Sequence, residues 1–560
     1  MLRLFPPLAT VLLVGPVLAG LAGTILPAFD YLPVLGHRAA GLQAWRQLLE
    51  LPGLWTSVWL SLSTGLATTI LSMLLVVLLC AAWHGTKVFV ALEAWLAPLL
   101  SVPHVTVALG LAFVISPSGW IMRCLSPWAT GFSHPPDWRI VQDAGGLSLM
   151  FGLIAKEAPF LLLMTLAALG QADGKRGSMV ARTFGYRPMM GWLKAVFPRV
   201  YPQIRLPVLA VLAYGVSVVD VAMVLAPTTP APLAVRVVKM ANDSDLNLRF
   251  IASAGALLQC VLVIVGVFCW WLVERTVRWW GIRWVTAGNR GGRESIPRWI
   301  ASIAGGTLGL AVILGLLAMT VWSVATHWRF PSAIPAGVTW ANWTLHASGF
   351  TGALCNTLSV AVCTAAASLV LSVGVLEFEA ASGRRTMLSQ GGFLYIPLVL
   401  PQVAFLFGAQ VLLALSRLDG EWIALAWLHL VFVFPYVFLA LSDAYRAWDE
   451  RYRRTGLCLG VPPFRVLLRI KLPMLLRPIA AAGAVGFAVS VGQYLPTLFA
   501  GAGRFPTLTT EAVALSAGGD LRSVGIYALL QMALPLAAFA LALAAPAWCF
   551  RHRGGMQVIR

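Results

Sequence analysis

The sequence predicts an all-α polytopic membrane protein with about 12 transmembrane helices. Only 11% of its 560 residues are charged, whereas soluble proteins carry about 25%. The mean hydropathy is +0.82. Apolar runs of about 20 residues recur along the whole chain, and each can cross the hydrocarbon core of a bilayer. Helices are the expected spans, because a helix satisfies its own backbone polar groups inside lipid.

The apolar runs define the expected spans in chain order. The run at 4–29 follows Arg3 and also resembles a signal peptide, but its length favours a first spanning helix. The expected spans are 8–29, 55–83, 95–116, 146–170, 206–227, 250–273, 299–325, 352–376, 392–416, 422–444, 479–500 and 525–550.

Lysine and arginine are distributed unevenly between the loops. With the N-terminus in the cytoplasm, the cytoplasmic side holds about 28 of the 40 basic residues and about 9 acids. The opposite side holds about 11 basic and about 10 acidic residues. This sidedness explains most of the net charge of +19 without nucleic acid as a partner. It predicts a multi-pass protein in contact with membrane lipid, with both termini in the cytoplasm.

The second half of the sequence repeats the first. We therefore predict a first repeat of six spans at 1–273, a basic cytoplasmic linker at 274–298, and a second repeat of six spans at 299–560. Because each copy has an even number of spans, both have the same orientation. The repeat rests on these pairs: SVPHVTVALGLAF (101–113) with VLPQVAFLFGAQV (399–411), VSVVD (216–220) with VSVGQ (489–493), and ALLQ at 256–259 and 528–531.

Each repeat has one long basic loop, at 171–206 and at 445–478. In the second loop, Gly460 permits a left-handed turn. The prolines that follow suit the start of a short helix, and Pro473 is expected to end it. Its apolar and basic side chains alternate with helical spacing. We predict a short amphipathic helix that docks a two-fold partner; the alternative is a helix lying on anionic lipid.

The spacing of Gly460, Ile470, Leu472 and Pro473 resembles the EAA loop of binding-protein-dependent ABC importer permeases. The glutamate of that motif is replaced by Met179 in the first loop and by Arg454 in the second. By this resemblance, the residues that couple to the ATPase are Gly185, Pro188, Leu193, Pro198, Gly460, Pro463, Leu468, Ile470, Leu472 and Pro473.

The resemblance is closest to the fused two-domain permeases of iron(III) and thiamine importers. It implies a type I, MetI-like fold in a bacterial inner membrane. It also implies two copies of an ABC ATPase subunit and a periplasmic solute-binding protein as partners. The substrate would be thiamine, iron(III) or a similar small molecule or ion.

The chain itself is not expected to be an enzyme. Its nearest approach to a P-loop, GQADGKRG (170–177), is one residue short and ends in arginine and glycine, so ATP hydrolysis is assigned to a separate subunit. The alternative is an ion-coupled secondary transporter of six plus six helices, which would use several acids inside the membrane. The eight His and eight Cys show no metal-binding spacing, and no cofactor is expected.

Four polar residues of the fifth and eleventh spans are candidates for the translocation path. A carboxylate in mid-bilayer needs a wet or paired environment. The alternative is that these residues form hydrogen bonds between helices. Lys156 and Glu157, in the fourth span, are expected to have a structural role. The candidate path residues are Asp220, Gln493, Ser217 and Ser490.

Overall fold

The computed structural model describes residues 2–172, 174–390 and 392–551. These residues are mainly helical, and the described part contains no β-strand. The predicted all-α membrane fold is confirmed. Nine helical segments of the described part are long and apolar enough to cross a membrane. Their helices are α1 (Phe5–Ala28), α3 (Leu54–Trp83), α5 (His104–Ile115) with α6 (Trp120–Leu125), α7 (Leu147–Gln171), α13 (Leu248–Thr286), α14 (Ser295–Val324), α16 (Ala347–Ser382), α20 (Trp422–Arg446) and α27 (Leu521–Cys549).

Two bent helix pairs raise the number of spans in the described part to eleven. Residues 393–399, which end in α18 (Ile396–Val399), meet α19 (Gln402–Leu415) at 100°. Residues 463–474 meet α24 (Leu476–Val491) at 77°. Several of the expected spans are therefore bent or broken in the structure.

Four expected spans are interrupted. The break between α4 (Lys87–Ser101) and α5 precedes Pro103, and the break between α18 and α19 precedes Pro401. In both cases the residue before the proline is extended, because a proline disfavours helical geometry there. The expected span 206–227 is divided between α10 (Phe197–Ser217) and α11 (Asp220–Leu225), and 479–500 is divided between α24 and α25 (Leu495–Gly501).

The first helix of each predicted repeat packs against the other repeat. α1 packs along α19 and also contacts α16 and α20, whereas α14 packs on α5 and α3. α5 also contacts α27 and α26 (Leu508–Ser516), and α19 contacts α13 and α12 (Leu233–Ala241). The two predicted repeats are thus joined by exchanged first helices as well as by the linker.

Glycines allow these exchanged helices to approach closely. A Cβ atom added to Gly23 would lie 2.6 Å from the backbone oxygen of Gly408, and one added to Gly315 would lie 2.8 Å from the carbonyl carbon of Gly110. The backbone N–H of Gly408 donates to Thr24 Oγ1 at 3.1 Å. Small residues let membrane helices pack without hydrophobic driving force between them.

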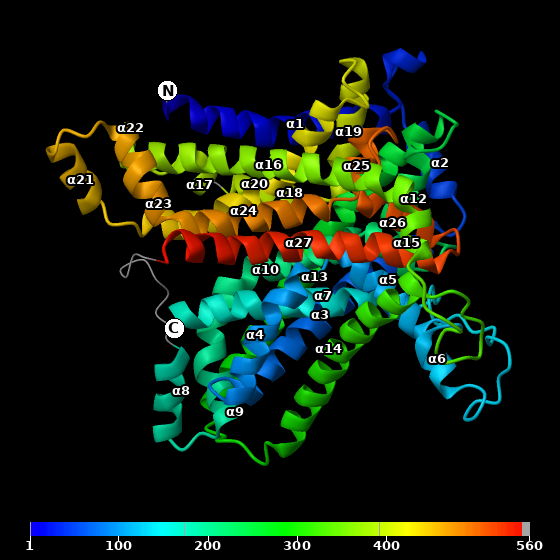
Figure 1. Cartoon of the computed structure of the whole chain (residues 1–560), viewed down its shortest axis with the longest axis horizontal. Coiled ribbons are helices and arrows are strands. Elements are labelled where there is room, and N and C mark those ends of the chain that lie inside the picture. The colour runs from blue at the N-terminus through cyan, green and yellow to red at the C-terminus, as the bar shows by residue number, and fades with distance from the viewer. Residues whose placement is uncertain (1, 173, 391, 552–560) are drawn as a thin grey trace.

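The bundle has two distinct ends (Figure 1). α8 (Gly174–Thr183), α9 (Pro188–Gly191), α21 (Arg451–Cys458) and α22 (Pro463–Val466) lie at one end, with the start of α1 and the end of α27. We call this the basic end, because the two long basic loops form it. α2 (Gln43–Glu50), α12, α15 (Ala341–Leu345) and α26 lie at the opposite end.

Candidate functional site

The two basic loops share one backbone design. Gly185 and Gly460 have φ values of 79° and 77°, a left-handed conformation that favours glycine. The N–H after each glycine reaches back to the end of the preceding helix. Tyr186 donates to the Ala181 carbonyl at 3.1 Å, and Val461 donates to the Gly456 carbonyl at 3.0 Å. These bonds close α8 and α21 in the manner of a Schellman cap.

A second short helix follows each turn. Pro188 begins α9 and Pro463 begins α22, positions at which the missing proline N–H costs no helical hydrogen bond. A π-helical turn comes next in both loops: η3 (Trp192–Val196) and η5 (Leu467–Lys471). We call α9 with η3 the first coupling helix, and α22 with η5 the second coupling helix, after the role that the sequence predicts for them.

The two coupling helices continue differently. The first runs through Pro198 into α10 without interruption. The second runs into α23 (Leu472–Met474), one residue beyond the predicted terminator Pro473, and then bends into α24. Leu193, Ile470 and Leu472 are half-buried, whereas Leu468 is 46% exposed.

A small residue lies where each coupling helix crosses the preceding helix. In the first loop, a Cβ on Gly191 would meet the Ala181 side chain at 3.0 Å. In the second loop the glycine lies on the preceding helix and the larger residue on the coupling helix: a Cβ on Gly456 would meet the Val466 side chain at 3.0 Å. Ala181 and Gly456 are the residues that the sequence comparison places at the last position of the predicted EAA motif, and close helix packing explains why both are small.

The linker holds the first coupling helix. The backbone N–H of Met189 donates to Glu294 Oε1 at 2.9 Å, and that of Arg187 donates to the Arg290 carbonyl at 3.1 Å. A carboxylate is favourable at this position, because the first N–H groups of a helix have no internal partner. The Lys194 ammonium lies 4.9 Å from the centre of the Trp284 ring. The linker therefore fixes the position of the first coupling helix through contacts with both its start and its π-turn.

A buried ion pair holds the second coupling helix. Lys471 Nζ lies 2.8 Å from Glu377 Oε2, and the two side chains are 3% and 11% exposed. The Tyr445 hydroxyl donates to the same Glu377 oxygen at 2.7 Å. The Lys471 ammonium also lies 4.1 Å from the centre of the Tyr445 ring and 4.9 Å from that of Trp448. This ammonium is enclosed by α16, α20 and the loop that follows α20.

Asp220 lies at the centre of a polar group within the bundle. It is the first residue of α11, directly after the break that ends α10. The Tyr214 hydroxyl donates to Asp220 Oδ1 at 3.2 Å, and the His104 ring lies 5.1 Å from the Tyr214 ring. His104 Nε2 is 3.2 Å from Glu157 Oε1. The predicted path residue Asp220 thus has neighbours that the sequence alone did not bring together.

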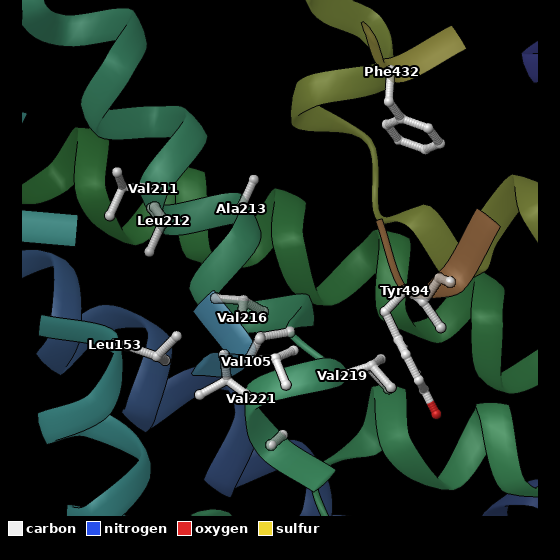
Figure 2. Close-up of a cluster of buried hydrophobic side chains, with 14 of the residues drawn as sticks. Val105, Leu153, Val211, Leu212, Ala213, Val216, Val219, Val221, Phe432 and Tyr494 are labelled. Atoms are coloured by element: carbon white, nitrogen blue, oxygen red, sulfur yellow. The ribbon is translucent and has the colours of Figure 1, made fainter. Parts of the chain in front are cut away.

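Two tyrosines of the second predicted repeat lie within electrostatic range of this group, Tyr494 of Asp220 and Tyr436 of Glu157. Figure 2 shows Tyr494 in one buried cluster with Val219, the residue before Asp220. We call Asp220, Glu157, His104, Tyr214, Tyr436 and Tyr494 the polar centre.

The other candidate path residues have different surroundings. Ser217 donates to the Ala213 carbonyl of its own helix at 2.7 Å. Ser490 is buried, 2.9 Å from His429 Nδ1 and 3.2 Å from Thr364 Oγ1. Gln493 is half-buried and precedes Tyr494. The bonds of Ser217 and Ser490 match the structural alternative, in which serines satisfy their hydroxyls within or between helices.

Lys156 supports the broken α4–α5 segment. Its ammonium is buried and donates to the carbonyls of Leu99, Leu100 and Val102. These carbonyls lie at the end of α4, where helix carbonyls lack internal partners and a cation is favourable. Only Pro103 signals a break in the sequence, so sequence analysis could not assign these partners to Lys156.

Comparisons with known proteins decide the class of the chain. The family described as "Binding-protein-dependent transport system inner membrane component" matches residues 357–547. The Escherichia coli (strain K12) "Inner membrane ABC transporter permease protein YnjC" is 31% identical over 526 residues, which cover 93% of both chains. The chain is an ABC transporter permease. The alternative of an ion-coupled secondary transporter is not favoured.

Shorter relatives match part of this permease. The "Molybdenum transport system permease protein ModB" of Mycobacterium bovis and that of Mycobacterium tuberculosis are each 32% identical over 171 residues. The matched part covers 27% of the permease and 64% of each ModB chain. The family consists of components of transport systems that depend on a binding protein.

Proposed function

We propose that the permease forms the complete translocation path of an importer and couples it to a separate ABC ATPase. The two coupling helices would each seat on one copy of the ATPase subunit. A periplasmic solute-binding protein would deliver solute at the opposite end. The observation that carries this proposal is the repeated glycine turn, proline-initiated helix and π-turn at one end of the bundle.

The basic end presents apolar side chains suited to docking. Phe464 is 68% exposed and Leu468 46% exposed on the second coupling helix. Phe184 is 66% exposed beside the first. Exposed apolar residues grouped among cations are typical of a protein contact. Seating of these residues on a symmetric motor would transmit its closure to both predicted repeats.

The polar centre supports the path assignment of Asp220. It joins both predicted repeats and contains two carboxylates and three tyrosines. Carboxylates and aromatic faces together attract cations. A small cationic solute such as thiamine or iron(III) fits this chemistry. The matching positions of Asp220 and His104 in the second repeat are Gln493 and Gln402, which are uncharged.

The test uses the permease purified with its ATPase from native membranes and reconstituted into vesicles. Phe464→Asp with Leu468→Asp should abolish ATPase co-purification and ATP-driven uptake, because charge on the docking surface prevents seating. Ile334→Asp is the matched control, since Ile334 is 74% exposed away from the coupling helices. Asp220→Asn should retain the ATPase but lower uptake of a cationic solute roughly tenfold or more, the loss expected for a charged hydrogen-bond partner.

Two outcomes contradict the proposal. One is normal co-purification of the ATPase with the doubly substituted coupling helix. The other is uptake by the permease alone on an ion gradient without nucleotide, which would reinstate the secondary-transport alternative.

A further inference from the structure

A cleft of about 780 Å³ opens beside the first coupling helix. Its walls come from three places in the fold: the last residue of α3, the linker with the start of α14, and the start of α9. The volume is in the range of small-molecule sites. The residues that matter here are Trp83, Arg187, Arg293, Glu294, Arg298 and Trp299.

The cleft has an excess of positive charge. Its lining contains three arginines and one glutamate. Glu294 already accepts the Met189 N–H and lies 3.0 Å from Arg298 Nη2. The buried Arg298 Nε has no hydrogen-bond partner among the described residues. Arg187 and Arg293 are exposed. The lining therefore offers guanidinium groups to an anion that the described part does not supply.

The cleft also lies at the boundary of the apolar spans. Trp83 ends α3 and Ser295 begins α14, and both helices meet the criteria for a membrane span. On α14, Trp299 lines the cleft and is 68% exposed, and Ile303 just beyond the cleft is 62% exposed. Tryptophan at the end of a span is typical of the membrane–water interface. An occupant would thus meet cations on one side and apolar side chains on the other.

We propose that this cleft binds the headgroup of an anionic phospholipid. The phosphate lies against Arg187, Arg293 and Arg298, and the acyl chains follow Trp299 and Ile303 along α14. The combination of charge complementarity and a continuous apolar wall favours a lipid over a free anion. Because Arg293 belongs to the linker and Arg187 directly precedes the first coupling helix, one lipid would join the two.

The lipid would regulate the coupling that the proposed function assigns to this helix, and this consequence rests on that function. Binding itself does not. An anionic lipid in the cleft would strengthen the linker contacts that hold the first coupling helix, whereas the second relies on its own buried ion pair. Anionic lipid would therefore raise ATPase stimulation through one loop.

The test measures phosphatidylglycerol retained by the full-length permease in native mass spectrometry. Arg187→Gln with Arg293→Gln should weaken retention roughly thirtyfold, since each arginine at an anionic lipid surface contributes about fivefold. Arg278→Gln with Arg384→Gln is the matched control and should retain lipid like the wild type. Both control arginines are exposed at the basic end and outside the cleft.

A second variant leaves the three arginines of the cleft unchanged and reduces the space beside its apolar wall. Ser302→Trp fills the cleft without changing its charge and should also release the lipid. Equal lipid retention by the cleft and control variants overturns the proposal. So does competition by millimolar inorganic phosphate, which would indicate a free-anion site. If the cleft variant retained lipid normally but no longer co-purified with the ATPase, the cleft would instead bind an acidic side chain of the ATPase subunit, and the proposal would be wrong.

Discussion

The two coupling helices have nearly the same backbone but different supports. Both follow a left-handed glycine, begin at a proline and pass through a π-turn. The first is held by the linker through Glu294 and Arg290, and it continues straight into α10. The second is held by the buried Lys471–Glu377 pair and bends by 77° into α24. The local turn sequence therefore determines the backbone conformation of each coupling helix, whereas the contacts that hold the helix in place differ between the two loops.

The largest effect should come from the buried pair. Glu377→Gln leaves the Lys471 ammonium enclosed without its charge partner, which costs roughly 3–5 kcal/mol. We expect a much lower thermal unfolding midpoint, measured by tryptophan fluorescence of the permease in detergent. Replacing both residues, Glu377→Leu with Lys471→Met, should recover most of the stability. A double variant as unstable as the single one would show that the pair is not the anchor.

An intermediate effect should come from the helix crossing. Gly456→Ala places a Cβ 3.0 Å from Val466, and overpacking of this kind costs about 1–3 kcal/mol. Adding Val466→Gly reproduces the Ala181–Gly191 arrangement of the first loop. A double-mutant cycle on the unfolding midpoint should then give a favourable interaction of roughly 1 kcal/mol. Purely additive effects would mean that the two loops do not pack alike.

The smallest effect should come from the linker contact. Glu294→Gln keeps an acceptor for the Met189 N–H but removes its charge, a change of about 1 kcal/mol. We expect trypsin to cut the linker about fivefold faster at Arg290 and Arg293, because local opening becomes easier. Glu450→Gln, in a partly exposed 3.5 Å pair with Arg453 near the second coupling helix, is the control. Equal acceleration by both substitutions would refute a specific role for Glu294.

The sequence predicted local features well. The left-handed turn at Gly460 and the helix that starts at Pro463 occur as expected, and Gly185 and Pro188 form the same pair of features in the first loop. These features depend on residues within a few positions, where glycine and proline have strong preferences. The roles of these residues in coupling, and the division into repeats at 1–273 and 299–560, stay predictions.

Features that depend on distant partners could not be predicted. Hydropathy identifies a span but not its neighbour, so the pairing of α1 with α19 was not foreseen. The break before Asp220 contains no proline, so Asp220 was expected within a continuous helix. His429 was overlooked, because only folding places it between Ser490 and Thr497.

The crossing of α1 with α19 also affects how the protein is made. Thr24 and its partner Gly408 are 384 residues apart in the chain. During synthesis, α1 enters the bilayer long before the ribosome has produced the helix that will cover its glycine face. The newly made first helix must therefore remain in lipid, or be shielded by the insertion machinery, until α19 has also been inserted.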